Sequence, residues 1–350
     1  MLAFRWLFFL PKPSRETGNL LTVEQFRRVL ERERSRADRT GTTFGIVAIR
    51  LTTRGEARLA SRITGRLRVT DVAGRLADRR LGILLADTPP EGARRFCDHL
   101  REHVAEDARG ETLEIELIFY PSTLAADLVD PANAPASQEQ LALTELPPVF
   151  VQPLPVWKRL IDVVGASIGL LMLAPLLGAA ALVVKLTSRG PVIFRQRRVG
   201  LGGRPFWIYK FRTMCIDAEQ RKADLMARNE QDGPAFKIKN DPRVTPVGRF
   251  LRKSCIDELP QLVNVIKGDM TLVGPRPLPS DETAGCRQWE RRRLDVTPGM
   301  TCIWQADGRR VAFPDWMRMD IRYLRNRTFW QDVKLIWKTF LKVLFFRASH

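Results

Sequence analysis

The stretch Val163–Val184, VVGASIGLLMLAPLLGAAALVV, contains 22 consecutive uncharged residues and decides how the chain is organised. A helix of this length can cross the hydrocarbon core of a bilayer. Pro175 lies near its middle, where proline kinks or breaks a helix. Both flanks are basic, so the charge asymmetry that sets the orientation of a membrane span is missing. We therefore expect a kinked re-entrant hairpin over residues 160–186, open to the cytoplasmic face; an ordinary span and a buried soluble helix are the alternatives.

A second membrane element is expected near the C-terminus, over residues 332–347. Apolar side chains recur there at helical spacing: Val333, Ile336, Trp337, Phe340 and Leu344. A row of lysines at i, i+4 spacing runs beside them: Lys334, Lys338 and Lys342. An aromatic and aliphatic face beside such a row is typical of an amphipathic helix that lies in the membrane interface. An amphipathic helix packed on a protein core is the alternative.

The net charge of +18 is concentrated in the second half of the chain. Residues 1–155 contain 22 Lys/Arg and 21 Asp/Glu, whereas residues 156–350 contain 35 and 18, a net charge of +17. This excess predicts an anionic partner: nucleic acid, anionic lipid or a phosphorylated substrate. The five cysteines form no CxxC pair and there are three histidines, which argues against zinc sites and a disulfide framework.

The first half of the chain predicts a small sheet covered by helices, an α/β sandwich-like domain over residues 1–120. Helical and strand patterns alternate in it. The expected helices are 23–39, 57–69 and 90–104, and the expected strands are 44–51, 81–86 and 113–120.

Two further segments fall outside this pattern. Residues 121–156 are rich in Pro, Ala, Ser and Gln and are expected to form a linker. The apolar residues 1–10 are too short to span a bilayer and lack a small-residue cleavage site. A strand or an interfacial turn is expected for them.

The motif Ser254-Cys-Ile-Asp257-Glu258-Leu-Pro260 points to chemistry. Ser254 and Asp257 match the start of a capping box, and Pro260 fits a first helical turn, so both carboxylates are expected at a helix N-terminus. There the helix dipole keeps a carboxylate ionised, and free amides attract phosphate. Such a carboxylate can be an acyl-phosphate-forming nucleophile or a metal ligand. A plain capping cluster is the alternative for the motif alone.

Cationic residues surround this motif in the sequence. Guanidinium groups match the geometry of phosphate, so two carboxylates among them predict a Mg²⁺–diphosphate site. The candidate substrate-binding residues are Lys210, Arg212, Arg252, Asp269, Arg276, Gln305 and Arg309.

Residues 156–350 resemble the bacterial sugar transferases, which are monotopic polyprenyl-phosphate phosphoglycosyl transferases. The matching motifs are KRLIDVVGASIGLLMLAPLL, FRQRRVGLGGRPFWIYKFRTM, DELPQL, GDMTLVGPRP and PGMTCIWQADGR. The resemblance implies transfer of a sugar-1-phosphate from a UDP-sugar to polyprenyl (undecaprenyl) phosphate with release of UMP, the first membrane step of exopolysaccharide, capsule or O-antigen synthesis. It places an aspartyl-phosphosugar intermediate on Asp257 and a magnesium ligand on Glu258. The family's usual Ser-Pro break reads Ala174-Pro175 here.

The resemblance also implies a mainly helical catalytic domain over residues 157–350, held on the cytoplasmic face of the bacterial inner membrane. Membrane lipid is then a partner, nucleic acid is not, and a homodimer is left open. The first domain resembles a degenerate GGDEF domain in which Ala77-Asp78-Arg79-Arg80-Leu81 replaces the signature, so GTP cyclisation is excluded. The expected fold class is α+β. The alternatives are a basic nucleic-acid-binding protein and a membrane-anchored nucleotide-binding scaffold with an inactive transferase half.

Overall fold

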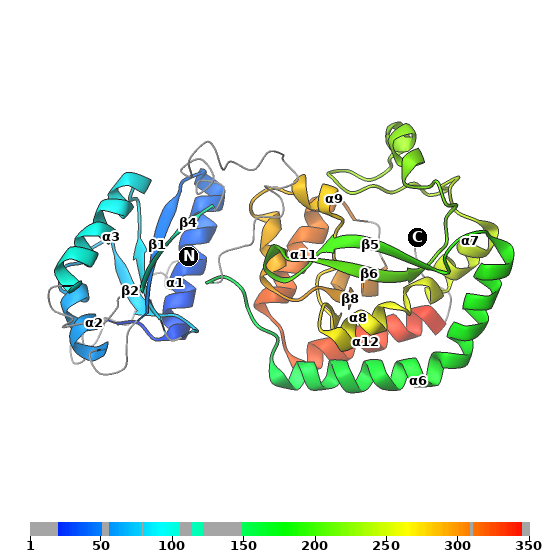
Figure 1. Cartoon of the computed structure of the whole chain (residues 1–350), viewed down its shortest axis with the longest axis horizontal. Coiled ribbons are helices and arrows are strands. Elements are labelled where there is room, and N and C mark those ends of the chain that lie inside the picture. The colour runs from blue at the N-terminus through cyan, green and yellow to red at the C-terminus, as the bar shows by residue number, and fades with distance from the viewer. Residues whose placement is uncertain are drawn as a thin grey trace, which may run out of the picture. The chain divides into compact units, whose positions relative to one another are not determined.

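The computed structural model describes residues 20–50, 56–78, 80–105, 114–121, 149–308 and 311–344. The chain divides into two compact units, Met1–Ala134 and Pro135–His350, which are shown in Figure 1. The apolar residues 1–10 and most of the predicted linker, residues 122–148, lie outside the described residues. The end of that linker packs on the second unit, where Phe150 is buried and the Gln152 amide donates to the Asp295 carbonyl at 2.7 Å.

The first unit is a four-stranded antiparallel sheet in the order β2-β3-β1-β4, with helices on both faces. Helix α1 lies on one face, and α2 and α3 lie on the other (Figure 1). The expected helices and strands are all present, and β2 is added to them. Their bounds are α1 Val23–Thr40, β1 Phe44–Arg50, α2 Glu56–Thr64, β2 Val72–Arg75, β3 Leu81–Leu85, α3 Pro90–Ala105 and β4 Glu114–Tyr120.

Local sequence explains how α1 starts and how closely it packs. Thr22 and Gln25 form a capping box at its N-terminus. Phe26 then lies directly against the sheet, because a Cβ atom on Gly74 or Gly82 would lie 2.4 or 2.5 Å from atoms of Phe26. Glycine at both positions is therefore needed for this approach of helix to sheet.

The turn between β2 and β3 carries the residues that replace the GGDEF signature. Arg80 pairs with Asp78 at 2.6 Å and also with Glu116 on β4. Arg79 lies outside the described residues. The arginine therefore ties the turn to the sheet and occupies the nearby carboxylates.

The second unit is mixed: helices surround a β-hairpin and a two-stranded parallel ribbon. Its strands are β5 Ile193–Val199, β6 Pro205–Phe211, β7 Thr271–Val273 and β8 Gly299–Thr301. Its α-helices are α6 Val156–Thr187, α7 Pro246–Lys253, α8 Gln261–Lys267, α9 Ser280–Ala284, α10 Ile303–Asp307, α11 Phe313–Arg325 and α12 Phe329–Leu344. Short 3₁₀ helices are η2 Leu201–Gly203, η3 Gln220–Arg228, η4 Ile256–Glu258 and η5 Glu290–Asp295.

Helix α6 corrects the predicted hairpin in one respect. It is one continuous helix with Pro175 inside it, and not two helices joined by a break. Figure 1 shows that α6 bends part-way along its length, and an internal proline is a common cause of such a kink. Only 11% of its most apolar window is buried, and it is the one described helix long and apolar enough to cross a membrane. Its re-entrant path stays a prediction.

The basic residues before the apolar run are used inside the protein. Lys158 pairs with Asp332 on α12, and both side chains are buried. Arg159 donates to the Val265 and Ile266 carbonyls at the end of α8, both at 2.6 Å. In the sequence these two cations form part of the basic flank before the apolar run, and in the structure both bind partners within the folded unit.

Both ends of α6 are anchored to the same unit. Its beginning is held through Lys158 and Arg159, as described above. At its end, the Arg212 guanidinium donates to the Ser188 carbonyl at 2.8 Å and to the Ser188 hydroxyl at 2.7 Å. The second unit therefore holds α6 at both of its ends.

Helix α12 begins at Phe329, earlier than the predicted residue 332, and residues 345–347 lie outside the described chain. One side of it packs on the core, where Leu335 is 5% exposed and contacts a cluster with Val273 and Tyr323. The other side leaves Trp337 59% and Phe340 54% exposed. The helix therefore packs on the core with one side, and the predicted contact of its exposed side with the membrane interface stays a prediction.

Candidate active site

The two predicted catalytic carboxylates lie in a tight turn between α7 and α8. Asp257 and Glu258 belong to η4, and Cys255 just before it has a φ of 56°. This left-handed conformation is uncommon for a residue other than glycine and reverses the chain direction over one residue. The turn thereby presents two adjacent side chains from a short, well-anchored segment.

The predicted capping box at this turn is wrong. The Ser254 hydroxyl donates backwards, to the Phe250 carbonyl at 2.9 Å and to the Leu251 carbonyl at 3.1 Å. Serine makes such bonds to the preceding turn as readily as it caps a following helix. The dyad consequently lies in a 3₁₀ turn ahead of α8, and Pro260 takes the N-cap position of that helix.

Glu258 is clamped by two cations. Lys210 Nζ lies 2.7 Å from its Oε1 atom, and Arg276 donates to both of its carboxylate oxygens. Although burial by itself would raise the pKa of Glu258, Arg276 and Lys210 hold it well below its usual range. Glu258 is therefore a permanently charged, oriented carboxylate.

Asp257 is in the opposite situation. It is 6% exposed, and its Oδ1 atom has no hydrogen-bond partner among the described residues. Burial, and then the neighbouring Glu258 charge, raise the pKa of Asp257, although Lys210, Arg252 and Arg276 oppose this. A buried carboxylate with a free oxygen is a good nucleophile or ligand, because little solvation has to be removed from it.

Arg276 is fixed by a close crossing of two backbone segments. A Cβ atom on Gly299 would lie 2.0 Å from the Gly274 nitrogen, so only glycine fits there. The crossing continues the β7–β8 ribbon and holds the loop that carries Arg276. The buried Arg293, paired with Asp320 at 2.8 Å, also donates to the Arg276 carbonyl.

The β5–β6 hairpin supplies the other cations from one of its faces. Phe194 pairs with Lys210 and Arg198 pairs with Phe206, so Lys210 and Arg198 share a face. Arg198 lines the same pocket as Glu258, where burial and then Arg276 lower its pKa to about 10. The prediction missed Arg198, although strand alternation from Lys210 through the hairpin would have found it.

The structure separates the predicted substrate-binding residues into two groups. Arg276 and Gln305 line the pocket, and Lys210 reaches it through Glu258. Arg252 lies behind the dyad, with its Nε atom 3.0 Å from the Thr213 hydroxyl. Two positions are not brought to the site: Arg212 anchors α6, and Asp269 accepts from Asn264 and Lys267 at the far end of α8. Arg309 lies outside the described residues, so its predicted role stays a prediction.

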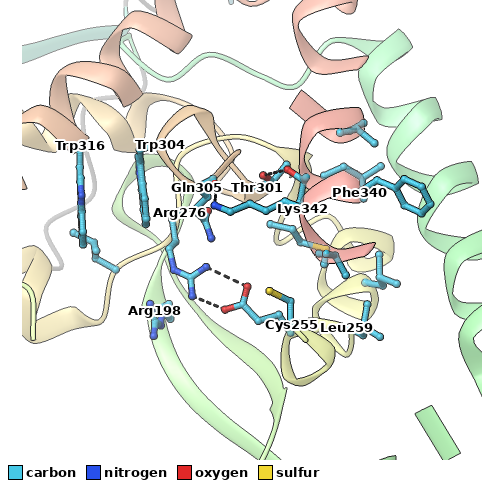
Figure 2. Close-up of a pocket in the computed structure, with 18 of the residues that line it drawn as sticks. Arg198, Cys255, Leu259, Arg276, Thr301, Trp304, Gln305, Trp316, Phe340 and Lys342 are labelled. Atoms are coloured by element: carbon cyan, nitrogen blue, oxygen red, sulfur yellow. Dashed lines mark hydrogen bonds and ion pairs between the residues drawn. The ribbon is translucent and has the colours of Figure 1, made fainter. Parts of the chain in front are cut away.

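Glu258 and its neighbours Cys255 and Leu259 line a pocket of about 780 Å³ with two chemically different sides, whereas Asp257 lies buried next to it and is not one of the lining residues. One side is polar and aromatic: Arg198 and Arg276 lie near Trp304, which stacks on Trp316 with ring centroids 4.4 Å apart. The other side is apolar and is formed by α6, α8 and α12, with Leu259 and Phe340 at its edge. Figure 2 shows the arginines and tryptophans on one side and these apolar side chains on the other.

A magnesium ion was predicted at Glu258. Among the described residues, no group of three or more His, Cys, Asp or Glu side chains is arranged to hold a metal. Magnesium is, however, commonly held by one or two carboxylates together with substrate phosphates. The unpartnered Oδ1 atom of Asp257 beside Glu258 fits this donor set, with the lone oxygen on Asp257 and not on the clamped Glu258.

Comparison with known proteins identifies relatives of the second unit. The sequence model of one family, described as bacterial sugar transferase, matches residues 154–346. The galactosyl transferase CpsE of Streptococcus agalactiae serotype III is 45% identical over 190 residues, covering 53% of this chain and 42% of that protein. The undecaprenyl-phosphate galactose phosphotransferase of Salmonella typhimurium is 42% identical over 202 residues, covering 53% and 40%. The chain spans less than half the length of these two relatives.

A shorter relative and one solved structure complete the comparison. The UDP-glucose:undecaprenyl-phosphate glucose-1-phosphate transferase of Caulobacter vibrioides is 43% identical over 193 residues, covering 52% of this chain and 67% of that protein. A DGC protein from Thermotoga maritima is 18% identical and covers 34% of this chain and 98% of its own, with a TM-score of 0.27. That score is too low to assign a fold, so the GGDEF-like reading of the first unit stays a prediction.

Proposed function

Because the chain belongs to the bacterial sugar transferase family, we propose that it transfers a sugar-1-phosphate from a UDP-sugar to polyprenyl phosphate and releases UMP. The names of two relatives include undecaprenyl phosphate as the acceptor. The observation that carries the proposal is the dyad: a buried Asp257 with a free oxygen beside a Glu258 that Lys210 and Arg276 hold in place.

The proposed reaction has two displacements at one phosphorus atom. First, an oxygen of ionised Asp257 bonds to the β-phosphorus of the UDP-sugar, and the bond from this phosphorus to the bridging oxygen breaks, so that UMP leaves. Second, an oxygen of the lipid phosphate bonds to the same phosphorus, and the bond to Asp257 breaks. The free carboxylate is thereby regenerated, and the product carries the sugar on a lipid diphosphate.

The cations around the dyad support this chemistry. Arg276 and Arg198 line the pocket together with Glu258, the neighbour of Asp257, and there they would position diphosphate oxygens and stabilise charge on the leaving UMP. The free Oδ1 atom of Asp257 and the substrate phosphates would hold a Mg²⁺ ion, which would neutralise part of the diphosphate charge. Glu258 keeps Arg276 and Lys210 in place for both displacements.

The apolar side of the pocket supports a lipid acceptor. Gly165, Gly169 and Leu173 of α6 line it from one side, and Ile336 and Phe340 of α12 line it from another. A polyprenyl chain could lie along this surface while its phosphate reaches the dyad. Leu171, Met172 and Leu182 of α6 are exposed and apolar, so the same helix would contact the surrounding lipid.

We also propose a monotopic arrangement on the cytoplasmic face of the inner membrane. Both ends of α6 are held by one unit, through Lys158 at the beginning and Ser188 at the end. A helix anchored in this way cannot cross the bilayer unless the folded unit is divided by the membrane. The bend in α6 lets the helix dip into one leaflet and return.

Trapping the intermediate tests the proposed function. The full-length protein in detergent is incubated with radiolabelled UDP-sugars, one at a time, with no acceptor present. A phosphosugar adduct is expected on the wild type with at least one sugar and is expected to be absent from Asp257→Asn. Asp269→Asn is the matched control and should form the adduct, since Asp269 lies at the far end of α8 from the dyad, where Asn264 and Lys267 bind it. An adduct on Asp257→Asn would refute the assignment of the nucleophile.

A further inference from the structure

The three lysines of α12, which form one row at i, i+4 spacing in the sequence, lie in three different environments in the structure. Lys334 is exposed to solvent. Lys338 pairs with Asp307 at 2.6 Å. Lys342 is half-buried and lines the active-site pocket. The last of these lysines therefore has a different environment, which calls for a different role.

Lys342 has spare hydrogen-bonding capacity in the pocket. Its Nζ atom donates to the Gln305 carbonyl at 2.7 Å, which leaves two further N–H groups. Among the described residues it forms no ion pair, in contrast to Lys338. Burial lowers the pKa of Lys342, which shows that its charge is poorly solvated in the absence of an anion. Figure 2 shows Lys342 extending from α12 towards Gln305, on the same side of the pocket as Arg276.

The backbone opposite Lys342 is shaped to admit it. Gly308 has a φ of 70°, and a Cβ atom there would lie 2.4 Å from the Lys342 Nζ atom. A side chain at position 308 would push the ammonium group away. The glycine thus permits both the left-handed end of α10 and the approach of the lysine.

The location of Lys342 distinguishes between the two phosphate-bearing substrates. Its neighbours on α12, Phe340 and Val343, line the apolar side of the pocket, whereas Arg198 lies on the polar side with the tryptophan pair. A lipid phosphate has to lie where its hydrocarbon chain ends and the dyad begins. Lys342 lies at this junction, because it follows Phe340 on α12 while its Nζ atom reaches the Gln305 carbonyl on the side of Arg276.

We propose that Lys342 binds the phosphate of the lipid acceptor and positions it for attack on the aspartyl intermediate. This inference rests on the proposed function. It gives Lys342 a role in the second displacement and none in the first. The alternative source of phosphate is the diphosphate of the donor, and the two are separated by measuring each half-reaction.

The test compares Lys342→Met with Lys334→Met, a matched control on the exposed face of the same helix. In the full-length protein in detergent, adduct formation from the UDP-sugar is measured without acceptor. Discharge of the isolated adduct by polyprenyl phosphate is then measured separately. For Lys342→Met we expect an unchanged rate of adduct formation and a rise of about tenfold or more in the acceptor concentration needed for half-maximal discharge. Lys342→Arg, which keeps the charge, should recover part of this loss.

Two results would overturn the inference. If Lys342→Met slows adduct formation as much as discharge, the lysine serves the donor diphosphate. If Lys342→Met and Lys334→Met discharge alike, the lysine serves neither phosphate.

A direct binding measurement keeps the inference separate from the proposed function. A short-chain polyprenyl phosphate and the corresponding polyprenol, which lacks the phosphate, are titrated against both variants and the wild type. The wild type and Lys334→Met should prefer the phosphate, and Lys342→Met should lose most of that preference. Equal preference in all three would contradict the inference. A wild type that forms no adduct with any UDP-sugar but shows this pattern would refute the proposed function alone.

Discussion

Replacing Lys158 by methionine is expected to destabilise the second unit severely, because it leaves a buried charge without its partner. Lys158 and Asp332 are 3% and 5% exposed, and their side chains form an ion pair. Tyr323 adds to the network: its hydroxyl lies 3.2 Å from Lys158 Nζ, 2.7 Å from Asp332 Oδ1 and 2.9 Å from the Val273 carbonyl. Removing one partner of such a pair typically costs about 3–5 kcal/mol.

The double variant Lys158→Met/Asp332→Leu separates the cost of an orphaned charge from the value of the pair. Replacing both partners by apolar side chains of similar volume is often neutral or stabilising. We therefore expect the double variant to recover most of the stability that the single variant loses. Tyr323 keeps the Val273 carbonyl as a partner in that variant.

Thermal unfolding in detergent, followed by tryptophan fluorescence, measures the effect. For a domain of this size, a loss of 3–5 kcal/mol corresponds to a drop in Tm of roughly 6–20 °C. Lys334→Met, at an exposed position, is the control and should stay within about 0.5 kcal/mol of the wild type. The reasoning is wrong if Lys158→Met matches this control, or if the double variant loses as much as the sum of both single variants.

Three further outcomes follow from the site and from α6. Because burial raises the pKa of Asp257 to about 6, the ionised nucleophile is lost as the pH falls through that value. The rate of adduct formation should therefore decline below about pH 6, and a rate that stays level to pH 4.5 would contradict this. Arg276→Lys should slow adduct formation at least about tenfold, because lysine cannot hold both oxygens of Glu258; a rate within twofold of wild type would count against the clamp. Cysteines placed at Val156 and Arg189, both exposed near the ends of α6, should react with an impermeant reagent only after the cells are opened, and labelling of either from outside would show a crossing helix.

Helices and strands that bury one face could be predicted from the sequence, because their apolar residues recur at a regular spacing. Helix α1 and strand β1 start and end close to the predicted positions, because their apolar spacing, capping residues and bounding glycine all agree. Strand β2 was missed because its four residues are too few to show an alternating pattern. The dyad was found because two adjacent carboxylates among cations are a chemical signal as well as a structural one.

Side-chain partners were less predictable, because a cation in the sequence does not show which anion or carbonyl it will meet. Arg212 and Arg276 both seemed suited to phosphate, yet Arg212 binds the carbonyl of Ser188 at the end of α6. Lys158 belongs to the basic flank of the apolar run and is buried against Asp332. Lys342 belongs to the lysine row of the predicted interfacial helix and lines the pocket. In each case the partner of the cation lies more than 20 positions away in the chain. The spacing of residues within one helix or strand carries no information about such a partner.

With α6 in lipid, as proposed above, the two bonds from Arg159 to the carbonyls at the end of α8 would make lipid chain length a variable of the proposed reaction. Helix α8 begins directly after the dyad turn, so a change in the tilt of α6 has to be taken up by the segment that carries Asp257 and Glu258. Helices adjust their tilt when the hydrocarbon around them becomes thinner or thicker. The reaction rate should therefore differ between bilayers of short and long acyl chains, even at equal substrate concentrations. In short-chain detergents, α6 and the dyad turn would be held differently than in the native membrane.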